Sequence, residues 1–332
     1  MTRLLATVLL VGLLASFPTQ GQESPTIPRV GFLAGAAFPG SPGAPRSRWS
    51  PHYALVDGLK DLGWIDGKNI IIVPKYAEGN LDRLPVLAQE LVQMKVDVIV
   101  AMGGPPLRPA AEATRSIPIV MVNGSADPVA DGFAASLARP GGNITGVTWA
   151  PSPELVGKIL ELLRDAIPGL SRVALLSDGP VRPKGWSAWN DAAQKLGIQV
   201  QKFEVYDPSE IESAIAKIGR ARAQAVHVTM GAATYSYRNQ VAALALAARL
   251  PAVATARELP EAGGLFSYGP NTAVAFRRGA AYVDKILRGA KAGDLPIEQP
   301  TNFDLVINVK TAKALGVKVP ASMLMQAAEV IE

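Results

Sequence analysis

Short apolar runs alternate with longer amphipathic segments along most of this 332-residue chain, and this alternation constrains the fold more than any other feature. Continuous apolar runs rich in β-branched residues are typical of strands that are buried on both faces of a parallel sheet. The segments between them carry apolar residues at helical spacing, as in PELVGKILELLRDAI (153–167) and PSEIESAIAKIGRA (208–221). The predicted strands are 29–35, 69–76, 96–103, 117–123, 172–178, 198–206, 225–231 and 250–256.

These strands fall into two sets of four, separated by a segment dense in Gly, Pro, Asp and Asn (123–149). Two such sets predict two doubly wound lobes, each with a parallel sheet covered by helices. A further strand (263–271), a helix (272–288) and a strand (303–310) follow the second set, before a tail helix (310–316). We therefore expect an α/β fold of two Rossmann-like lobes in which the chain crosses between the lobes more than once.

The N-terminus has the features of a secretory signal. One cation, Arg3, precedes the apolar run Leu4–Ala15, and the small residues Thr19 and Gly21 follow it. The pattern predicts cleavage after Gly21, and the run is too short for a transmembrane helix, which needs ~20 apolar residues. Because the chain has no cysteine, it can carry neither a disulfide nor a lipid-modified cysteine. We expect a mature protein that is free in the periplasm and not embedded in a membrane.

The chain carries few groups suited to catalysis. It has two histidines: His227 stands inside a predicted strand, where a core or cleft-edge residue is expected, and His52 opens a helix. No metal-ligand spacing, phosphate-binding glycine pattern or nucleophile elbow is present. The net charge of +5 comes from scattered cations without a basic run, which argues against nucleic acid as a partner. We expect no catalytic residue, no metal and no cofactor.

Small or polar residues stand at the carboxyl ends of the predicted strands, which is where open α/β sheets bind ligands. Glycines there let a ligand approach the amides at helix N-termini. Turn chemistry is the better explanation for each residue alone, but their recurrence favours a binding site, and aromatic faces among them suit a planar ligand. The expected ligand-binding residues are Gly35, Ala36, Gly103, Gly104, Asn123, Asp127, Trp149, Asp178, Met230, Arg257 and Tyr268.

More specific predictions are possible for Trp189 and Asp127. We expect Trp189, in WSAWNDA, to pack in a core, although other aromatic residues stand near the strand ends. Asp127 either caps the turn that follows it or accepts hydrogen bonds from a ligand amine or hydroxyl.

Long stretches of the sequence resemble the ABC-transporter substrate-binding family of the type I periplasmic-binding-protein fold, a family that includes binders of tryptophan and related aromatic amino acids. The resemblance covers residues 28 to 332. The stretches that carry it are DGLKDLGWIDGKNI (57–70), IPIVMVNGSADPVADGFAASLARPGGNITGVT (117–148), EAGGLFSYGPN (261–271) and RRGAAYVDKILRGAKAGDLPIEQPTNFDLVINVKTAKALG (277–316).

The resemblance implies a monomer with three crossings between its lobes, capture of a small-molecule ligand by hinge closure, and delivery to an ABC permease and its ATPase. It places the first crossing in GGNITGVTW (141–149) and the other two near Gly264 and Phe303. The implied division is 1–21 signal peptide, 28–146 plus 267–303 lobe 1, and 147–266 plus 304–332 lobe 2.

The sequence departs from the family pattern after the first and third strands. AGAAFPG (34–40) and MGGPP (102–106) stand where members commonly carry hydroxyl residues. An aromatic or other hydrophobic carboxylate is therefore as plausible a ligand as an amino acid, with Arg46, Arg48, Arg182 or Arg257 as candidate anion partners. The expected function is solute binding for an ABC importer. The alternative is a periplasmic sensor domain that presents the same clamp to a receptor.

Overall fold

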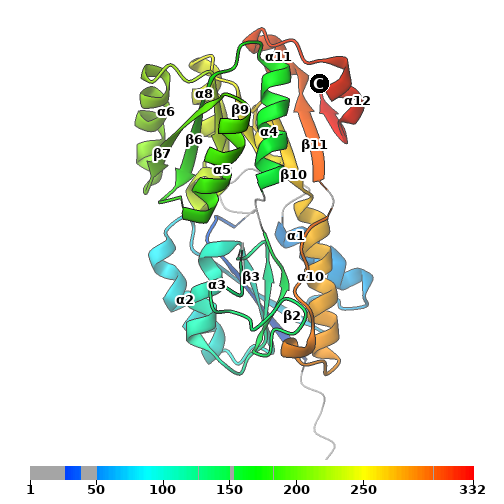
Figure 1. Cartoon of the computed structure of the whole chain (residues 1–332). Helices are drawn as coiled ribbons and strands as arrows, with labels where there is room; N and C mark the ends of the chain where they lie inside the picture. The colour runs from blue at the N-terminus through cyan, green and yellow to red at the C-terminus, as the bar shows by residue number, and fades with distance from the viewer. Residues whose placement is uncertain (1–26, 39–50, 126, 150–152, 182, 302) are drawn as a thin grey trace, which may run out of the picture.

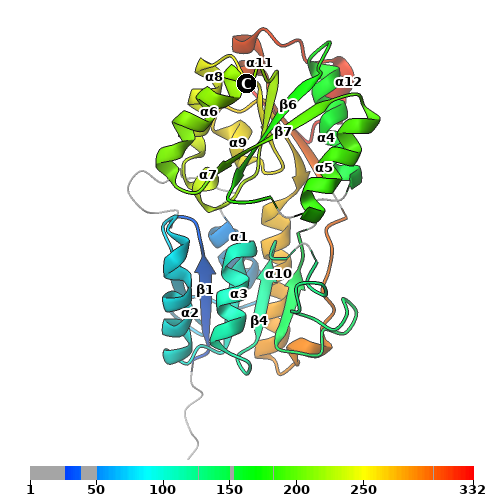
Figure 2. The same cartoon turned by 60° about the vertical axis from the view of Figure 1, so that its left-hand side comes forward.

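The chain folds into two lobes, each with a sheet between two layers of helices (Figure 1, Figure 2). The predicted α/β fold of two lobes is therefore confirmed. The structure is a computed structural model that describes residues 27–38, 51–125, 127–149, 153–181, 183–301 and 303–332.

The first lobe contains a five-stranded sheet in the order β2-β1-β3-β4-β5, and all neighbouring strands are parallel. Side chains alternate between its faces: Val98 and Val100 join a core cluster with α1 and α10, whereas Ile99 and Ala101 join one with α2 and α3. Its elements are β1 (Arg29–Ala34), α1 (Pro51–Asp61), β2 (Ile71–Tyr76), η1 (Leu81–Arg83), α2 (Leu84–Gln93), β3 (Val98–Met102), α3 (Gly104–Ala113), β4 (Ile119–Val122), β5 (Ile144–Val147), α10 (Thr272–Leu287) and η3 (Ala292–Asp294).

The second lobe contains a seven-stranded sheet in the order β12-β11-β10-β9-β8-β6-β7. The strands of the predicted second set, β6 to β9, are parallel as expected, whereas the later strand β11 runs antiparallel to β10. Its elements are α4 (Pro153–Ala166), β6 (Arg172–Asp178), α5 (Pro183–Lys195), β7 (Gln199–Val205), η2 (Pro208–Glu210), α6 (Ile211–Arg220), β8 (Ala225–Val228), α7 (Ala232–Ser236), α8 (Arg238–Ala247), β9 (Ala252–Ala254), α9 (Glu258–Glu261), β10 (Phe266–Pro270), β11 (Phe303–Asn308), α11 (Val309–Leu315), α12 (Ala321–Gln326) and β12 (Glu329–Ile331).

Every strand predicted in the two sets of four is present, as β1 to β4 and β6 to β9. The sequence interpretation did not include β5, which lies in the segment assigned to the first crossing, nor the short elements α12 and β12. These elements are short, and β5 has a glycine in its middle, so local periodicity gives little signal for them.

The first and second crossings lie later in the chain than the sequence interpretation placed them, whereas β11 begins at Phe303, next to the predicted third crossing. Phe266 pairs with Val253 of β9, and β10 also pairs with β11, so the strand around residue 267 belongs to the second lobe. The chain passes to the first lobe at Asn271, not near Gly264, and α10 packs on α1 there. Val147 likewise pairs with Val122 and so belongs to the first lobe. A short apolar run carries no local signal for which of two sheets it joins.

The three connections lie beside one another. The Thr148 amide donates to the carbonyl of Glu298 (2.8 Å), and the Glu298 amide donates to the carbonyl of Gly146 (2.9 Å), which joins the first and third connections. The Asn271 side-chain amide donates to Asp304 (3.0 Å), which joins the second and third. Adjacent connections of this kind suit rotation of one lobe against the other about a common line.

The core of the second lobe contains the histidine that the sequence placed in a strand. His227 is 3% exposed, and its ring centroid lies 4.6 Å from that of Trp189, whose predicted core position is confirmed. Neither ring nitrogen of His227 has a hydrogen-bond partner. Burial lowers the pKa of His227 to about 3, because the imidazolium form would have to stand unsolvated in the core.

Candidate functional site

The carboxyl ends of the strands in the two lobes face each other. β5 leads directly into the first connection, so the parallel strands β1 to β4 also end toward the second lobe. β10 leads into α10 of the first lobe, so the parallel strands β6, β8 and β9 end toward the first lobe (Figure 1). The Ala37 amide donates to the hydroxyl of Ser236 (3.2 Å) across these edges. The space between the edges is the candidate site.

In the first lobe the structure brings the predicted residues of β1, β3 and β4 to this edge. Gly103 precedes α3 with a φ of 78°, a conformation that suits glycine, and its amide donates to the carbonyl of Val122 (2.9 Å). Asn123 adopts a left-handed φ of 54°, and its buried side-chain oxygen has no partner. A ligand contact at Asn123 stays a prediction, and the left-handed backbone and the unsatisfied acceptor are consistent with it. Gly35, Ala36 and Gly104 lie beside these residues at the ends of β1 and β3.

Asp127 lies in the turn after β4. Its Oδ1 accepts from the amide of Ala130 (3.1 Å), and its own amide donates to the hydroxyl of Ser125 (3.0 Å). That hydroxyl in turn donates to the carboxylate of Asp131 (2.5 Å). The capping role is thus present, while a ligand contact stays a prediction.

We expect Asp127→Asn to separate these roles. The asparagine keeps a carbonyl for Ala130, so the free energy of unfolding of the unliganded protein should barely change, whereas Asp127→Ala should cost about 1 kcal/mol. If Asp127 also contacts the ligand, Asp127→Asn should weaken binding about tenfold or more in calorimetry. Unchanged affinity would leave Asp127 with the capping role alone.

In the second lobe, Asp178 is occupied by protein groups. Its carboxylate accepts from the amides of Ala233 (2.7 Å) and Thr234 (3.2 Å) at the start of α7. A Cβ on Gly231 would overlap this carboxylate, which explains the glycine. Burial raises the pKa of Asp178, and the hydrogen bonds from Thr234 and Ala233 oppose the rise. Met230, which follows β8, is half-buried and packs on the neighbouring core.

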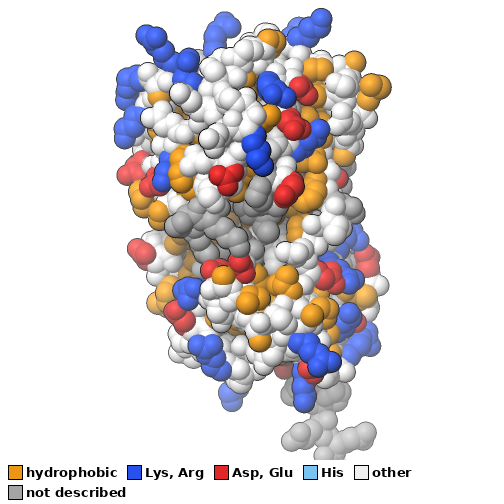
Figure 3. All heavy atoms as spheres, in the orientation of Figure 1, with side chains coloured by type: hydrophobic (Ala, Val, Ile, Leu, Met, Phe, Trp, Pro, Cys, Tyr) orange, Lys and Arg blue, Asp and Glu red, His pale blue; other side chains and the backbone are white. Residues whose placement is uncertain are grey.

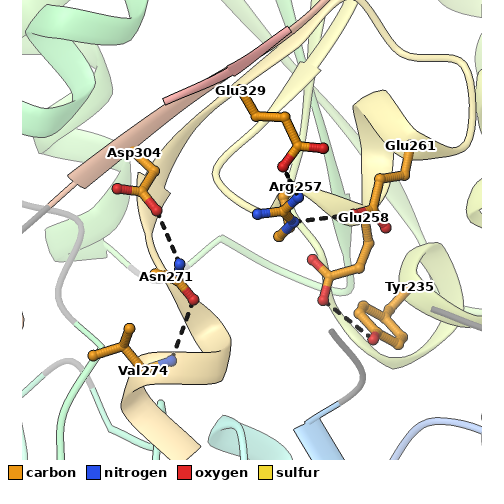
Figure 4. A network of polar contacts seen from close by, with 8 residues as sticks. All are labelled: Tyr235, Arg257, Glu258, Glu261, Asn271, Val274, Asp304 and Glu329. Carbon is orange, nitrogen blue, oxygen red and sulfur yellow. Dashed lines mark hydrogen bonds and ion pairs between the residues drawn. The ribbon is translucent and has the colours of Figure 1, made fainter. Parts of the chain in front are cut away.

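Arg257 is directed at carboxylates of this chain. It donates to Glu261 (3.0 Å) and to Glu329 (2.5 Å), and its side chain is 10% exposed (Figure 4). These pairs connect α9 to the C-terminal strand β12 and hold the pKa of Arg257 above its usual value against the effect of burial. The predicted role as an anion partner therefore competes with two protein carboxylates. The other candidate anion partners, Arg46, Arg48 and Arg182, lie outside the described residues, as does the predicted signal peptide.

The two aromatic residues predicted for the site lie against the core of the second lobe. Trp149 is half-buried beside the first connection, where its amide donates to the carbonyl of Ser125 (3.3 Å). Tyr268, on β10, stacks with Phe303 at a centroid distance of 6.0 Å. Both stand next to the connections, so a rotation of the lobes would move their surroundings.

The sequence interpretation missed an aromatic cluster at the edge of the first lobe. The rings of Phe38, His52 and Tyr76 meet there, with centroids 5.2 Å apart for Phe38 and Tyr76 and 5.7 Å apart for Phe38 and His52. The Nδ1 of His52 and the hydroxyl of Tyr76 are buried without partners. Burial lowers the pKa of His52 and raises that of Tyr76, so both stay neutral. The one indication of this cluster in the sequence is the aromatic residue Tyr76 at the end of β2.

A second group lies at the opposite edge, formed by Glu258 and Tyr235, which follow the predicted strands 250–256 and 225–231 in the sequence. Glu258 opens α9 just after β9, and its side chain lies beside the ring of Tyr235 from α7 (Figure 4). The Tyr235 hydroxyl donates to Oε1 of Glu258 (3.4 Å), and Oε2 has no partner. The signal in the sequence was a carboxylate directly after a buried strand.

The described residues contain no group of three or more His, Cys, Asp and Glu side chains arranged to hold a metal ion. Across the same ranges of the chain, no helix has the length and apolar character needed to cross a bilayer.

Comparison with known families decides what kind of protein this is. The profile of the family described as ABC transporter substrate binding protein matches residues 47–331. The chain belongs to this family. As a member of the ABC transporter substrate binding protein family, it is a solute-binding protein and not an enzyme.

Relatives of this substrate-binding protein are known in sequence and in structure. A tyrosine-binding protein from Clostridioides difficile is 26% identical over 80% of this chain and 76% of its own length. A structure from Streptococcus pneumoniae, an ABC domain in complex with L-Trp, is 24% identical and superposes with a TM-score of 0.82 over 92% of this chain and 99% of that one. A ligand-free, open substrate-binding protein with adhesive properties from Clostridium difficile is 25% identical and has a TM-score of 0.63 over the same shares.

These likenesses show that the two-lobed fold is shared. Figure 3 shows the described Lys and Arg side chains scattered over this face of the molecule, without a single basic patch among them.

Proposed function

We propose that this chain is the periplasmic solute-binding component of an ABC importer, and that it captures an aromatic amino acid or a related aromatic carboxylate between its lobes. In this proposal residues 1–21 direct export and are removed, closure of the lobes encloses the ligand, and the closed form delivers it to a permease and its ATPase. The family supports the transport role, because its members are substrate-binding proteins of ABC transporters.

The proposed ligand class rests on one observation: the first lobe offers an aromatic surface to the site, and the second lobe offers a polar acceptor. The aromatic cluster of Phe38, His52 and Tyr76 supplies ring faces and edges from the first lobe. The unsatisfied oxygen of Glu258 supplies a polar acceptor from the second. A planar ring with a polar end matches this combination, because aromatic pairs favour edge-to-face contact and buried acceptors need donors. The tyrosine-binding relative supports the same class.

A binding experiment on exported protein tests the proposal. The mature chain, purified from the periplasmic fraction and beginning near Gln22, should bind one aromatic solute per chain and release it unchanged. The probes are L-tyrosine, L-tryptophan and 3-(4-hydroxyphenyl)propionate, with L-arginine and D-glucose as unrelated solutes. At a hundredfold excess over its Kd, a ligand should stabilise the fold by about 2.7 kcal/mol in thermal unfolding.

A cluster variant connects that binding to this site. Phe38→Ala removes one ring of the aromatic cluster and should lower the affinity for the aromatic probe about tenfold. Val86→Ala, on an exposed position of α2, is the matched control and should leave affinity unchanged. Stabilisation only by the unrelated solutes, or equal affinity of Phe38→Ala and the control, would contradict the proposed ligand class.

A further inference from the structure

Glu258 is the most deeply buried carboxylate at the facing edges, and it is only half satisfied. Its residue is 1% exposed, Oε1 has one long hydrogen bond from the Tyr235 hydroxyl (3.4 Å), and Oε2 has none. Leaving a buried polar atom without a partner normally costs about 1–3 kcal/mol, and more for a charged group. A fold retains such an atom where something else supplies the missing donor.

The neighbouring cations do not supply that donor. Arg238 donates to the carbonyl of Tyr235 (2.7 Å) and lies over the Tyr235 ring at 4.6 Å from its centroid. Arg257 turns away toward Glu261 and Glu329, as Figure 4 shows. Neither guanidinium is hydrogen-bonded to Glu258, although both are near enough to act on its carboxylate through space. Oε2 therefore remains available at the end of β9, on the edge that faces the first lobe.

We propose that Glu258 receives the charged amino group of the ligand, with the Tyr235 ring and hydroxyl fixing the position of the carboxylate. This inference rests on the proposed function and selects an amino acid over a carboxylate that lacks an amine. An ammonium group suits the site because it brings three donors and a compensating charge to an acceptor that has no partner. A neutral hydroxyl could also donate to Oε2, but it brings no positive charge to favour the carboxylate form.

Binding of an ammonium group by Glu258 is coupled to release of a proton from its carboxyl group. Burial is the main cause that raises the pKa of Glu258, Glu261 adds to it, and the backbone hydrogen bond together with Arg238 and Arg257 opposes it. The titratable group in contact with Glu258 is Tyr235, whose pKa burial raises, so that it stays neutral. In the unliganded protein the carboxyl group therefore holds its proton to higher pH than a free glutamate. Binding an ammonium group requires the carboxylate and releases that proton.

The test compares two probes that differ only in the amino group, L-tyrosine and 3-(4-hydroxyphenyl)propionate. Wild-type protein should prefer L-tyrosine, and Glu258→Gln should bind L-tyrosine roughly tenfold to hundredfold more weakly while its affinity for the propionate stays unchanged. Glu261→Gln is the matched control, since it removes a carboxylate from the same short helix whose partner is Arg257, and it should keep the preference for L-tyrosine.

A pH series on the wild-type protein tests the proposal independently of whether Glu258→Gln folds. Between pH 5 and 8, the affinity for L-tyrosine should rise with pH relative to that for the propionate, because the carboxylate becomes available without displacing a proton. Equal affinity of wild-type protein for both probes, a parallel pH profile, or an unchanged L-tyrosine affinity in Glu258→Gln would each overturn the role of Glu258 while leaving the proposed function intact. Wild-type protein that binds neither these probes nor L-tryptophan would overturn the aromatic ligand class together with the inference.

Discussion

His227→Leu is expected to remove most of a stability loss that the wild-type protein suffers in mild acid. The folded protein keeps His227 neutral down to a pKa of about 3, whereas an unfolded chain takes up a proton near its usual pKa of 6.5. The unfolded state therefore binds more protons between these values, and the stabilising contribution is complete above pH 6.5 and is lost as the pH falls. The expected loss is about 1.4 kcal/mol for each pH unit, or about 2–3 kcal/mol at pH 4.5.

Urea unfolding of both proteins at pH 7.5 and pH 4.5 measures this effect. Leucine fills a similar volume beside Trp189 and introduces no buried nitrogen without a partner, so the two proteins should have comparable stability at pH 7.5. Contributions from His52 and the carboxylates are common to both proteins and cancel in the comparison. A parallel loss of stability in wild-type protein and in His227→Leu would show that His227 does not remain neutral in the folded chain.

Gly146→Ala should destabilise the first lobe strongly. Gly146 lies in β5 with a φ of 125°, and a Cβ there would overlap the carbonyl oxygen of Met121 and stand 2.9 Å from its amide nitrogen. Both atoms belong to the backbone of β4, so no side chain can move aside. Backbone strain of about 1–3 kcal/mol and overpacking of a similar size together give an expected cost of roughly 2–6 kcal/mol. That is a large part of a typical free energy of unfolding of about 5–15 kcal/mol.

Gly142→Ala is the matched control for this prediction. Gly142 lies in the same GGNITG segment, its φ is not in the left-handed region, and no atom lies within 4 Å of a Cβ added there. Thermal and urea unfolding should therefore show a large drop for Gly146→Ala and almost none for Gly142→Ala. Equal stability of the two variants would mean that β5 does not pair with β4 in the register described.

The sequence predicted the secondary structure of the two lobes well because burial leaves a local signal. A strand covered on both faces must be apolar at consecutive positions, as in the Val98–Met102 run, and α4 must place its apolar residues on one side. The predicted strand ends were close enough to locate Gly103, Asn123 and Asp178 at the edges that face each other.

Which strands pair with each other, and which charged side chains meet, left no such local signal in the sequence. The residues of Phe266–Pro270 do not by themselves indicate that this strand lies between β9 and β11 in the sheet of the second lobe. The second crossing was therefore placed too early. Likewise, Arg257 was expected to meet a ligand, but its guanidinium meets Glu329, which lies more than seventy residues away in the chain. A charged side chain forms its strongest contact with whatever the tertiary fold brings near, and sequence separation does not reveal it.

The sequence by itself determined that this chain is an α/β protein of two lobes with no evident catalytic apparatus, because apolar periodicity and the absence of reactive motifs are properties of short segments. Only the tertiary structure decided which polar atoms at the facing edges are already satisfied and which are not. Asp178 is held by the start of α7, whereas Oε2 of Glu258 and the side-chain oxygen of Asn123 are left without partners. That distinction depends on hydrogen bonds between residues distant in sequence, and these form only when the lobe that contains them is folded.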